Sequence, residues 1–455
     1  MSWRGNQLFC FKYGLISIVL IIFFGCHANP SDQDEISEDL SYKTYQLDEQ
    51  GNLIHSQMNA GDFQLPEDCA ECHPDHYQEW SNSRHGKSFT NPLFQELKAK
   101  TINHFGGEGE RFCLQCHDPV SIIANPNNIN TAINFSHGVS CDVCHSMTNL
   151  SPGVNTHPSS FVTAEYFLNP GEGIKYGPIE NPEPNTYHTS VYSPLFRRSE
   201  ICLPCHNLKI NDVEAEITFN EWNRIPEFAM SGAFPCQECH MPVKEDGRHD
   251  HGFAGVDVDL TQPADMDPQF EKVSAMIASA AELTFEDENG IILDSIQMSN
   301  QTHFPIKVTS LTGHSLPSGT SFNREVWLEL LMFDAENSED TLFQSGLIQS
   351  NQQPLNYSDS DLVWFTTFLL DENGDTASEV LSAHSILDFS LPGLATRQVK
   401  QDFPLTLENY NQIWIRARLL FRPVKPQLLQ DRPDLLANIP VYVIDELDKK
   451  VTILP

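Results

Sequence analysis

One five-residue pattern constrains this chain more than any other: Cys-x-x-Cys-His occurs five times between residues 69 and 240. Two thiols at this spacing reach the two vinyl groups on one edge of a porphyrin, and the adjacent histidine then ligates the iron. The pattern therefore predicts five covalently attached c-type haems. The attachment cysteines are Cys69, Cys72, Cys113, Cys116, Cys141, Cys144, Cys202, Cys205, Cys236 and Cys239, and the proximal iron ligands are His73, His117, His145, His206 and His240.

Zinc sites and disulfides are the competing interpretation, because paired Cys-x-x-Cys units also build zinc ribbons. Neither needs a histidine directly after each pair. The chain of 455 residues holds 18 histidines. A histidine directly after the second cysteine in all five motifs would arise by chance with a probability of roughly one in ten million.

The two cysteines outside the motifs, Cys10 and Cys26, lie in an N-terminal segment typical of exported proteins. Arg4 and Lys12 accompany an apolar run over 15–24 that is too short to span a bilayer, which predicts a signal peptide. The end of the run resembles the processing site of bacterial lipoproteins, so we expect lipidation at Cys26. Because Phe23 stands where leucine is usual, simple cleavage or a retained anchor are the alternatives. We expect an exported chain in the periplasm or at the outer membrane, held to the membrane by a lipid anchor only.

The organisation predicted from composition is a signal peptide (1–25), a flexible polar tether (26–62), a pentahaem domain (63–262), a helical linker (263–282) and a β-rich domain (283–455). The haem segment is rich in turn formers and offers too little protein per haem for a conventional core, so the porphyrins must supply buried apolar surface. Short helices are expected over 75–83, 91–101 and 219–224, and a helical bridge over 268–283.

The C-terminal region has the pattern of a sheet. Asn-Gly turns at Asn289 and Asn373 are strong hairpin signals. Residues 413–421 alternate between apolar and polar side chains with a period of two. Further strands are expected over 291–298, 326–333, 362–370, 397–403 and 440–444. The fold class is therefore α+β multidomain, with a loop-rich and short-helix-rich multihaem domain followed by an antiparallel β-sandwich.

The charge balance restricts the partners. The chain has 27 basic and 62 acidic residues, a net charge of −35, and haem propionates would add about ten negative charges. This surface repels nucleic acid and anionic lipid and favours basic or membrane-bound redox proteins, although solubility alone also explains many of the acidic residues.

Several segments resemble the multihaem cytochromes c, a group that includes the nitrifiers' tetrahaem cytochrome, octahaem hydroxylamine oxidoreductase and ammonia-forming nitrite reductase. The segments are 80–85, 138–145, 175–178, 188–190, 202–207, 218–222 and 236–242, and the resemblance covers about residues 66–256. The segments 311–319 and 324–328 also resemble a β-rich C-terminal domain that some members carry.

Function depends on the sixth ligand of each iron. A second histidine closes the site and favours an electron carrier, whereas an open position favours a catalyst. The resemblance implies distal ligands at His85, His188 and His251, with His249 as a rival of His251.

Three further distal candidates follow from position in the chain. His137 and His157 flank the third motif and compete for one haem, and His314 can reach an interface haem from the C-terminal domain. Met147, Met230 and Met241 are better explained as packing residues. The histidines ranked lower are His55, His76, His104, His303 and His384.

The sequence favours an electron carrier with five haem c groups, mainly bis-histidine. The alternative is a reductase of a small nitrogen or sulfur oxyanion at one open haem. The resemblance weakens that alternative, since the active haem of ammonia-forming nitrite reductases typically has lysine in place of the motif histidine, and all five motifs here end in histidine. A third hypothesis, a subunit that relays electrons to a separate catalytic chain, is compatible with the first.

Overall fold

The structure is a computed structural model that describes residues 45–47, 53–55, 58–124, 136–152, 164–229, 234–286, 291, 295–297, 306–337, 341–377, 379–399 and 410–454. The expected signal peptide and lipidation site lie outside the described residues, as do His157, His303, Met230 and the Asn289 turn. Within the described part of the chain, no helix combines the length and the apolar character needed to cross a membrane.

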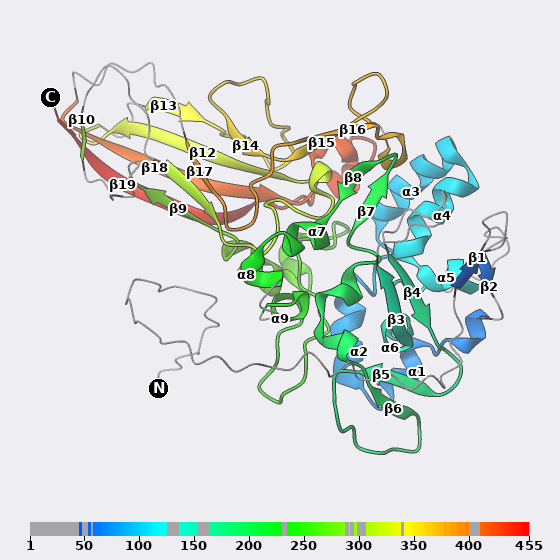
Figure 1. Cartoon of the computed structure of the whole chain (residues 1–455). Coiled ribbons are helices and arrows are strands. Elements are labelled where there is room, and N and C mark those ends of the chain that lie inside the picture. Colours follow the sequence, from blue (N-terminus) through cyan, green and yellow to red (C-terminus); the bar gives the residue numbers. More distant parts are fainter. Residues whose placement is uncertain are drawn as a thin grey trace. The chain divides into compact units, whose positions relative to one another are not determined.

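Short helices dominate the region of the five motifs (Figure 1). Several start with proline at the first turn, where its missing N–H costs nothing, among them α1 (Pro66–Ala70), α2 (Pro74–Asn82) and α3 (Pro92–Phe105). Asn91 caps α3 by accepting a hydrogen bond from the backbone N–H of Leu93, and Gly106 ends it at φ +61°. The helices predicted over 75–83, 91–101 and 219–224 are confirmed by α2, α3 and α7 (Thr218–Asn223). The others are α4 (Gly107–His117), α5 (Pro119–Ala124), α6 (Cys141–His145), α8 (Pro226–Ala229) and α9 (Cys236–His240).

Small two-stranded sheets join these helices and were not expected from the sequence. The antiparallel pairs are β1 (Tyr45–Leu47) with β2 (Leu53–His55), β3 (Met147–Pro152) with β4 (Ala164–Leu168), and β7 (Leu208–Ile210) with β8 (Val213–Glu216). The pair β5 (Ile174–Gly177) and β6 (Thr189–Tyr192) is parallel. The turn between β7 and β8 holds Asn211 at φ 47° and Asp212 at φ 66°, and both residue types tolerate this left-handed region.

The predicted helical bridge is shorter than expected. Helix α10 (Phe270–Ala278) ends before residue 281, where β9 (Ala281–Phe285) begins. Ala281, Leu283 and Phe285 are buried while Glu282 is exposed, so the apolar period changes to two and the chain becomes a strand.

The C-terminal strands form one large sheet and two smaller ones. The large sheet has the order β10 (Ser295–Gln297), β19 (Tyr442–Leu454), β18 (Gln412–Arg422), β12 (Glu325–Asp334) and β13 (Thr341–Ser345), and β14 (Val363–Phe365) also pairs with β12 (Figure 1). A three-stranded sheet has the order β17 (Thr396–Gln398), β11 (Ile306–Ser310), β9, and β15 (Thr367–Leu370) pairs with β16 (Ser385–Asp388). One buried cluster takes residues from both β9 and β11 on one side and β12 and β18 on the other.

The α+β class is confirmed, with three differences in detail. The stretch over 362–370 is two strands, β14 and β15, because Thr366 leaves the ladder and its hydroxyl donates to the carbonyl oxygen of Arg324 at 2.5 Å. The Asn373 turn exists, but β15 pairs with the later strand β16 and meets residue 376 only through an isolated bridge. The sheet is not wholly antiparallel, since β10 pairs with β19 in parallel.

Candidate haem-binding site

Each of the five motifs lies on a helical turn. Motifs 2 (113–117), 3 (141–145) and 5 (236–240) close α4, α6 and α9 with their histidines. In motif 1 (69–73) and motif 4 (202–206), the histidine N–H donates to the first cysteine carbonyl, at 2.8 Å in motif 1 and 3.0 Å in motif 4. A turn of this kind gathers both thiols and the imidazole on one side of the backbone, which is the arrangement that covalent haem attachment requires.

Four motif histidines face a second histidine ring across a gap of nearly constant width. Two imidazoles bound to opposite sides of one iron through bonds of about 2.0 Å place their ring centroids about 6.3 Å apart. The observed separations are 6.4 Å for His73 with His188, 6.2 Å for His206 with His85, 6.4 Å for His145 with His251, and 6.3 Å for His240 with His314. The residues of these four motifs therefore fit a haem iron between two imidazoles.

Hydrogen bonds of their backbone groups position His85 and His188. The carbonyl of His85 accepts a hydrogen bond from the N–H of Val139 at 3.1 Å. Gly138 permits this approach, because a Cβ at its φ of +62° would lie 2.5 Å from the His85 carbonyl oxygen. The N–H of His188 donates to Oδ1 of Asn185 at 3.0 Å, just before β6 begins.

His251 and His314 come from loops. The N–H of His251 donates to Oε2 of Glu79 in α2 at 2.9 Å, which ties the loop to this helix. His314 follows β11, and its carbonyl accepts a hydrogen bond from the hydroxyl of Thr312. The C-terminal region thus contributes a ring that faces motif 5.

In five histidines of the site, the second ring nitrogen has a partner that fixes the tautomer. A carbonyl oxygen only accepts, so Nδ1 must carry the proton and Nε2 remains a free donor of electrons to a metal. The hydrogen bonds from Nδ1 to carbonyl oxygens are His145 to Tyr176 at 2.7 Å, His240 to Ala254 at 2.6 Å, His251 to His249 at 3.0 Å, His314 to Ser315 at 3.0 Å and His117 to Ser88 at 3.3 Å.

Burial keeps these imidazoles neutral, the state in which histidine binds metals. It lowers the pKa of His85 to about 3, and the proximity of His206, His240 and His117 lowers it further. Burial also lowers the pKa values of His117, His145 and His240 to about 4, against the opposing effect of their backbone hydrogen bonds. The pKa values of His206, His251 and His314 are likewise lowered by burial.

Motif 2 differs from the other four. Among the residues that the structure describes, no histidine ring faces His117 across such a gap. The ring of Phe94 stacks on His117 instead, with centroids 4.0 Å apart and planes inclined by 12°. Phe94 belongs to a small apolar cluster with Cys113, Leu114 and Ile122. Burial raises the pKa of the Cys113 thiol to about 12, while the charge of Lys98 opposes the shift.

Other candidate histidines lie elsewhere. His137 is 3.9 Å from Glu67, and His104 pairs with Glu379 at 3.0 Å. His249, the rival of His251, donates from Nδ1 to the carbonyl of Met241 at 2.7 Å. His76 is 4.6 Å from His251, too close for an iron between the two rings. Met147 is buried in an apolar cluster with Val143 and Leu168, as expected for a packing residue.

Thiols of different motifs lie in contact. Hydrogen bonds join the side chains of Cys69 and Cys141, of Cys116 and Cys205, and of Cys202 and Cys236. The ten motif cysteines form no disulfide. Across the described residues, no three His, Cys, Asp or Glu side chains converge as a metal cluster would require. The facing imidazoles beside four of the motifs suit haem.

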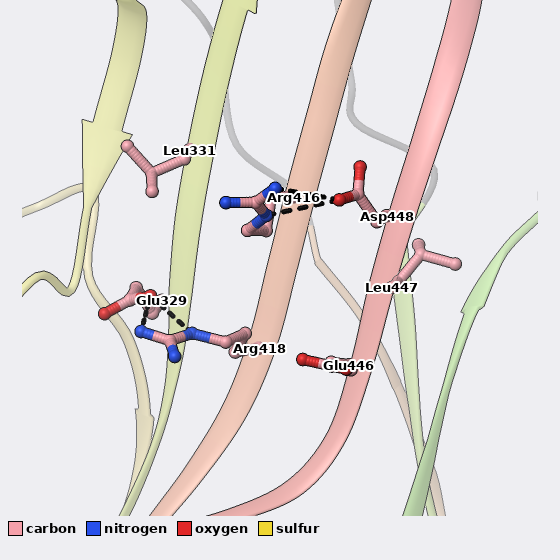
Figure 2. Close-up of a pocket in the computed structure, with 7 residues that line it drawn as sticks. All are labelled: Glu329, Leu331, Arg416, Arg418, Glu446, Leu447 and Asp448. Atoms are coloured by element: carbon pink, nitrogen blue, oxygen red, sulfur yellow. Dashed lines mark hydrogen bonds and ion pairs between the residues drawn. The ribbon is translucent and has the colours of Figure 1, made fainter.

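A surface depression lies away from the motifs, on the large sheet. Figure 2 shows two ion pairs there, Arg416 with Asp448 and Arg418 with Glu329, which join β18 to β19 and to β12. The remaining lining residues are Leu331, Glu446 and Leu447. Each ion pair joins two neighbouring strands of the sheet, and no motif residue lines the depression.

Comparisons with known proteins point the same way as this geometry. Residues 68–146, which include three motifs, match the family described as cytochrome c554 and c-prime. A penta-haem cytochrome c552 from Thermochromatium tepidum has a similar structure, with a TM-score of 0.63 and 20% identity over 86% of this chain and 99% of that chain. A search of curated proteins finds no match. The comparisons support a multihaem cytochrome c fold, whereas the expected relation to hydroxylamine oxidoreductase and nitrite reductase stays a prediction.

Proposed function

We propose that this chain is a pentahaem c-type cytochrome that conducts electrons through haems held mainly by two histidines each. The observation that carries the proposal is the constant gap of 6.2 to 6.4 Å between four motif histidines and a second imidazole. Two strong-field nitrogen ligands leave no coordination position for a substrate, and they favour lower reduction potentials than thioether ligation. The distal ligands assigned on this basis are His188, His85, His251 and His314.

The thiol contacts support an order for the haems, numbered by motif. Contacts of Cys69 with Cys141, of Cys116 with Cys205 and of Cys202 with Cys236 bring together haems 1 and 3, haems 2 and 4, and haems 4 and 5. The charge of Cys205 also acts on Cys144, which supports contact of haems 3 and 4. We propose the route 1–3–4, with branches from haem 4 to haems 2 and 5.

Haem 2 favours the second candidate function, reduction of a small nitrogen or sulfur oxyanion at an open iron. His117 faces no second histidine among the described residues, and Phe94 and Ile122 keep its surroundings apolar. Lys98 adds a positive charge that would attract an anion, with its Nζ 4.7 Å from the Phe89 ring centroid. His157, outside the described residues, remains the competing sixth ligand.

The remaining expectations belong to the same proposal. The chain is exported by residues 1–25, anchored at Cys26 and lifted by a polar tether over 26–62. The sheets after residue 283 form a β-sandwich, supported by the core that β9 and β11 share with β12 and β18. This domain docks a partner or stiffens the assembly. The partners are basic or membrane-bound redox proteins, because the net charge is −35.

The mass of the purified protein tests the number of haems, and its spectra test their ligands. We expect five covalent haems, with at least four low-spin irons in the electron-paramagnetic-resonance spectrum. Nitrite, hydroxylamine and carbon monoxide are then added. If all irons are low-spin and the spectra do not change with any of the three ligands, the reductase hypothesis is contradicted. If a high-spin iron is present and its spectrum changes, the hypothesis of an electron carrier alone is contradicted.

The variant His157→Ala decides the identity of the ligand at haem 2. If His157 binds this iron, the variant gains a high-spin signal that the unaltered chain lacks. If haem 2 is open, the spectra of the two proteins are the same. His104→Ala is the matched control, since His104 pairs with Glu379 and is not expected to bind iron.

A further inference from the structure

One buried and one half-buried carboxyl group lie where the haem segment meets the C-terminal region. Glu216 ends β8 and is 7% exposed, and Glu221 lies in α7. Two hydroxyls connect them. Thr218 contacts Oε1 of Glu216 at 2.6 Å and the hydroxyl of Ser318 at 2.8 Å, and Ser318 contacts Oε2 of Glu221 at 2.5 Å.

Proton counting shows that this chain of four groups can hold one additional proton. Three oxygen–oxygen contacts need three hydrogens, yet the two hydroxyls supply only two. The third contact is satisfied when one carboxyl is protonated. If Glu216 carries that proton, it donates to Thr218, which donates to Ser318, which donates to Glu221; the reverse order holds when Glu221 carries it. The hydroxyls can therefore pass one proton between the two carboxyls.

The surroundings of Glu216 disfavour its charged form. Burial raises the pKa of Glu216 to about 7, and hydrogen bonds from Thr218 oppose the shift. The charge of Glu221 raises this pKa further and that of Arg324 lowers it. Arg324 itself forms an ion pair with Asp257 at 2.9 Å, so its charge is already matched. Burial also raises the pKa of Glu221, as does the charge of Asp388.

One end of the relay reaches motifs 2 and 4, and the other end reaches the loop that carries His314. The pKa of the Cys116 thiol in motif 2 is raised by its hydrogen bond with Cys205, by burial, and by the charges of Cys205 and Glu216, which places the Glu216 carboxyl near these two sulfurs. At the other end, Oε2 of Glu221 accepts the N–H of Ser315 at 3.1 Å. A charge at Glu216 thus acts where haems 2 and 4 attach.

We propose that Glu216 is a redox-linked proton site, which takes up one proton from water through this relay when the neighbouring haems gain an electron. This inference rests on the proposed function, because it requires haems at Cys116 and Cys205. The electron comes from a reduced partner protein and converts one ferric iron to ferrous. The proton converts one carboxylate to a carboxylic acid, so the charge of the site is unchanged.

Spectroelectrochemical titration of the complete haem-loaded protein between pH 5.5 and 8.5 tests the proposal. A tenfold fall in proton concentration should lower the midpoint potential of at least one haem by up to about 59 mV, the value for a one-electron couple. We expect Glu216→Gln to flatten this dependence. Glu214→Gln is the control and should retain it, because Glu214 lies on the same strand with a side chain 43% exposed and pairs with Arg224 at 3.1 Å.

A second measurement does not depend on the variant folding. The infrared difference spectrum of the unaltered protein, reduced minus oxidised, should contain a protonated carboxyl band that grows on reduction. Potentials independent of pH, a slope that persists in Glu216→Gln, or the absence of this band would overturn the proposal while leaving an electron carrier. A protein without covalent haem would instead contradict the proposed function.

Discussion

In the proposed ligand set, the ring nitrogen that faces away from the iron decides whether His251 and His314 can bind it. His251 and His314 both commit Nδ1 to a backbone carbonyl at 3.0 Å, so their other nitrogen is unprotonated. The carbonyl that serves His251 belongs to His249, two residues earlier. The two candidates therefore have different roles in this interpretation. The ring of His251 binds the iron, and the backbone carbonyl of His249 orients that ring.

His314 provides the sharpest test at this scale. In His314→Ala we expect one of the five haems to change from low-spin to high-spin, because its iron loses one ligand. In His314→Met the iron should stay low-spin with a raised reduction potential, since thioether coordination favours the ferrous state. Electron paramagnetic resonance and redox titration measure both effects.

The control for these variants is His76→Ala. His76 lies 6.0 Å from His73, but it also packs 4.6 Å from His251, and His188 already faces His73. The spectra should therefore match those of the unaltered protein. An unchanged spin state in His314→Ala would show that His314 is not a ligand.

The buried ammonium of Lys425 should make the free energy of unfolding depend on pH. Its ammonium donates to the carbonyl of Thr367 at 3.1 Å, and burial lowers its pKa from 10.5 to about 8 against the opposing charge of Glu325. Between these values the unfolded chain binds more protons than the folded chain, so the free energy of unfolding rises with pH. The gain from pH 8 to 10.5 is about 3 kcal/mol.

Denaturant unfolding at pH 7, 9 and 10.5 measures this gain against Lys425→Met. The variant lacks the titrating group, so the difference between the two proteins should change in favour of the unaltered chain as the pH rises. Parallel stability curves would contradict the assignment.

At the scale of elements, local patterns were sufficient for some predictions. The motifs, helices α2, α3 and α7, and the alternation of β18 all follow from residues fewer than 15 positions apart. In β18, Ile413, Ile415 and Ala417 are fully buried, as the period of two predicts. The short strands β7 and β8 were missed because their three or four residues give no period to detect.

Ligand pairing could not be predicted from local patterns, because it joins distant residues. His85 precedes its partner by 121 positions (206−85), and His188 follows His73 by 115 (188−73). Nothing in the local sequence of His314 distinguishes a ligand from a turn residue. The relay from Glu216 to Glu221 was missed for the same reason, since Ser318 lies 100 positions beyond Thr218.

Gly393 tests the contact between two such distant elements. A Cβ here would lie 2.8 Å from the carbonyl oxygens of Thr312 and His314 and 2.6 Å from Cδ1 of Ile225. Gly393→Ala must therefore displace the loop that carries His314. We expect a destabilisation of about 1–3 kcal/mol together with a partial high-spin signal from one haem.

Thermal unfolding and electron paramagnetic resonance measure these two effects. Gly61→Ala is the control, because nothing lies within 4 Å of a Cβ at that position. If Gly393→Ala were destabilised but fully low-spin, the loop would not determine the position of the ligand.

At the scale of the whole molecule, the net charge of −35 should govern encounters. Electrostatic steering accelerates association by about 10- to 1,000-fold, and salt removes it as the Debye length falls from about 30 Å at 0.01 M to about 3 Å at 1 M. We expect the second-order rate of electron transfer with a small basic redox protein to fall at least about tenfold over this range.

Stopped-flow mixing at several salt concentrations measures that rate. A small acidic redox protein is the control, because screening should accelerate its reaction. A rate with the basic protein that does not depend on salt would contradict encounter by charge.

The position of His314 also has a consequence for biogenesis. It lies 74 positions beyond His240 (314−240), after the last attachment motif. A chain that has received all five haems but has not folded its C-terminal sheets would have haem 5 bound on one side only. The spin state of that iron would then distinguish half-assembled molecules from mature ones. Binding of the sixth ligand would mark the completion of folding.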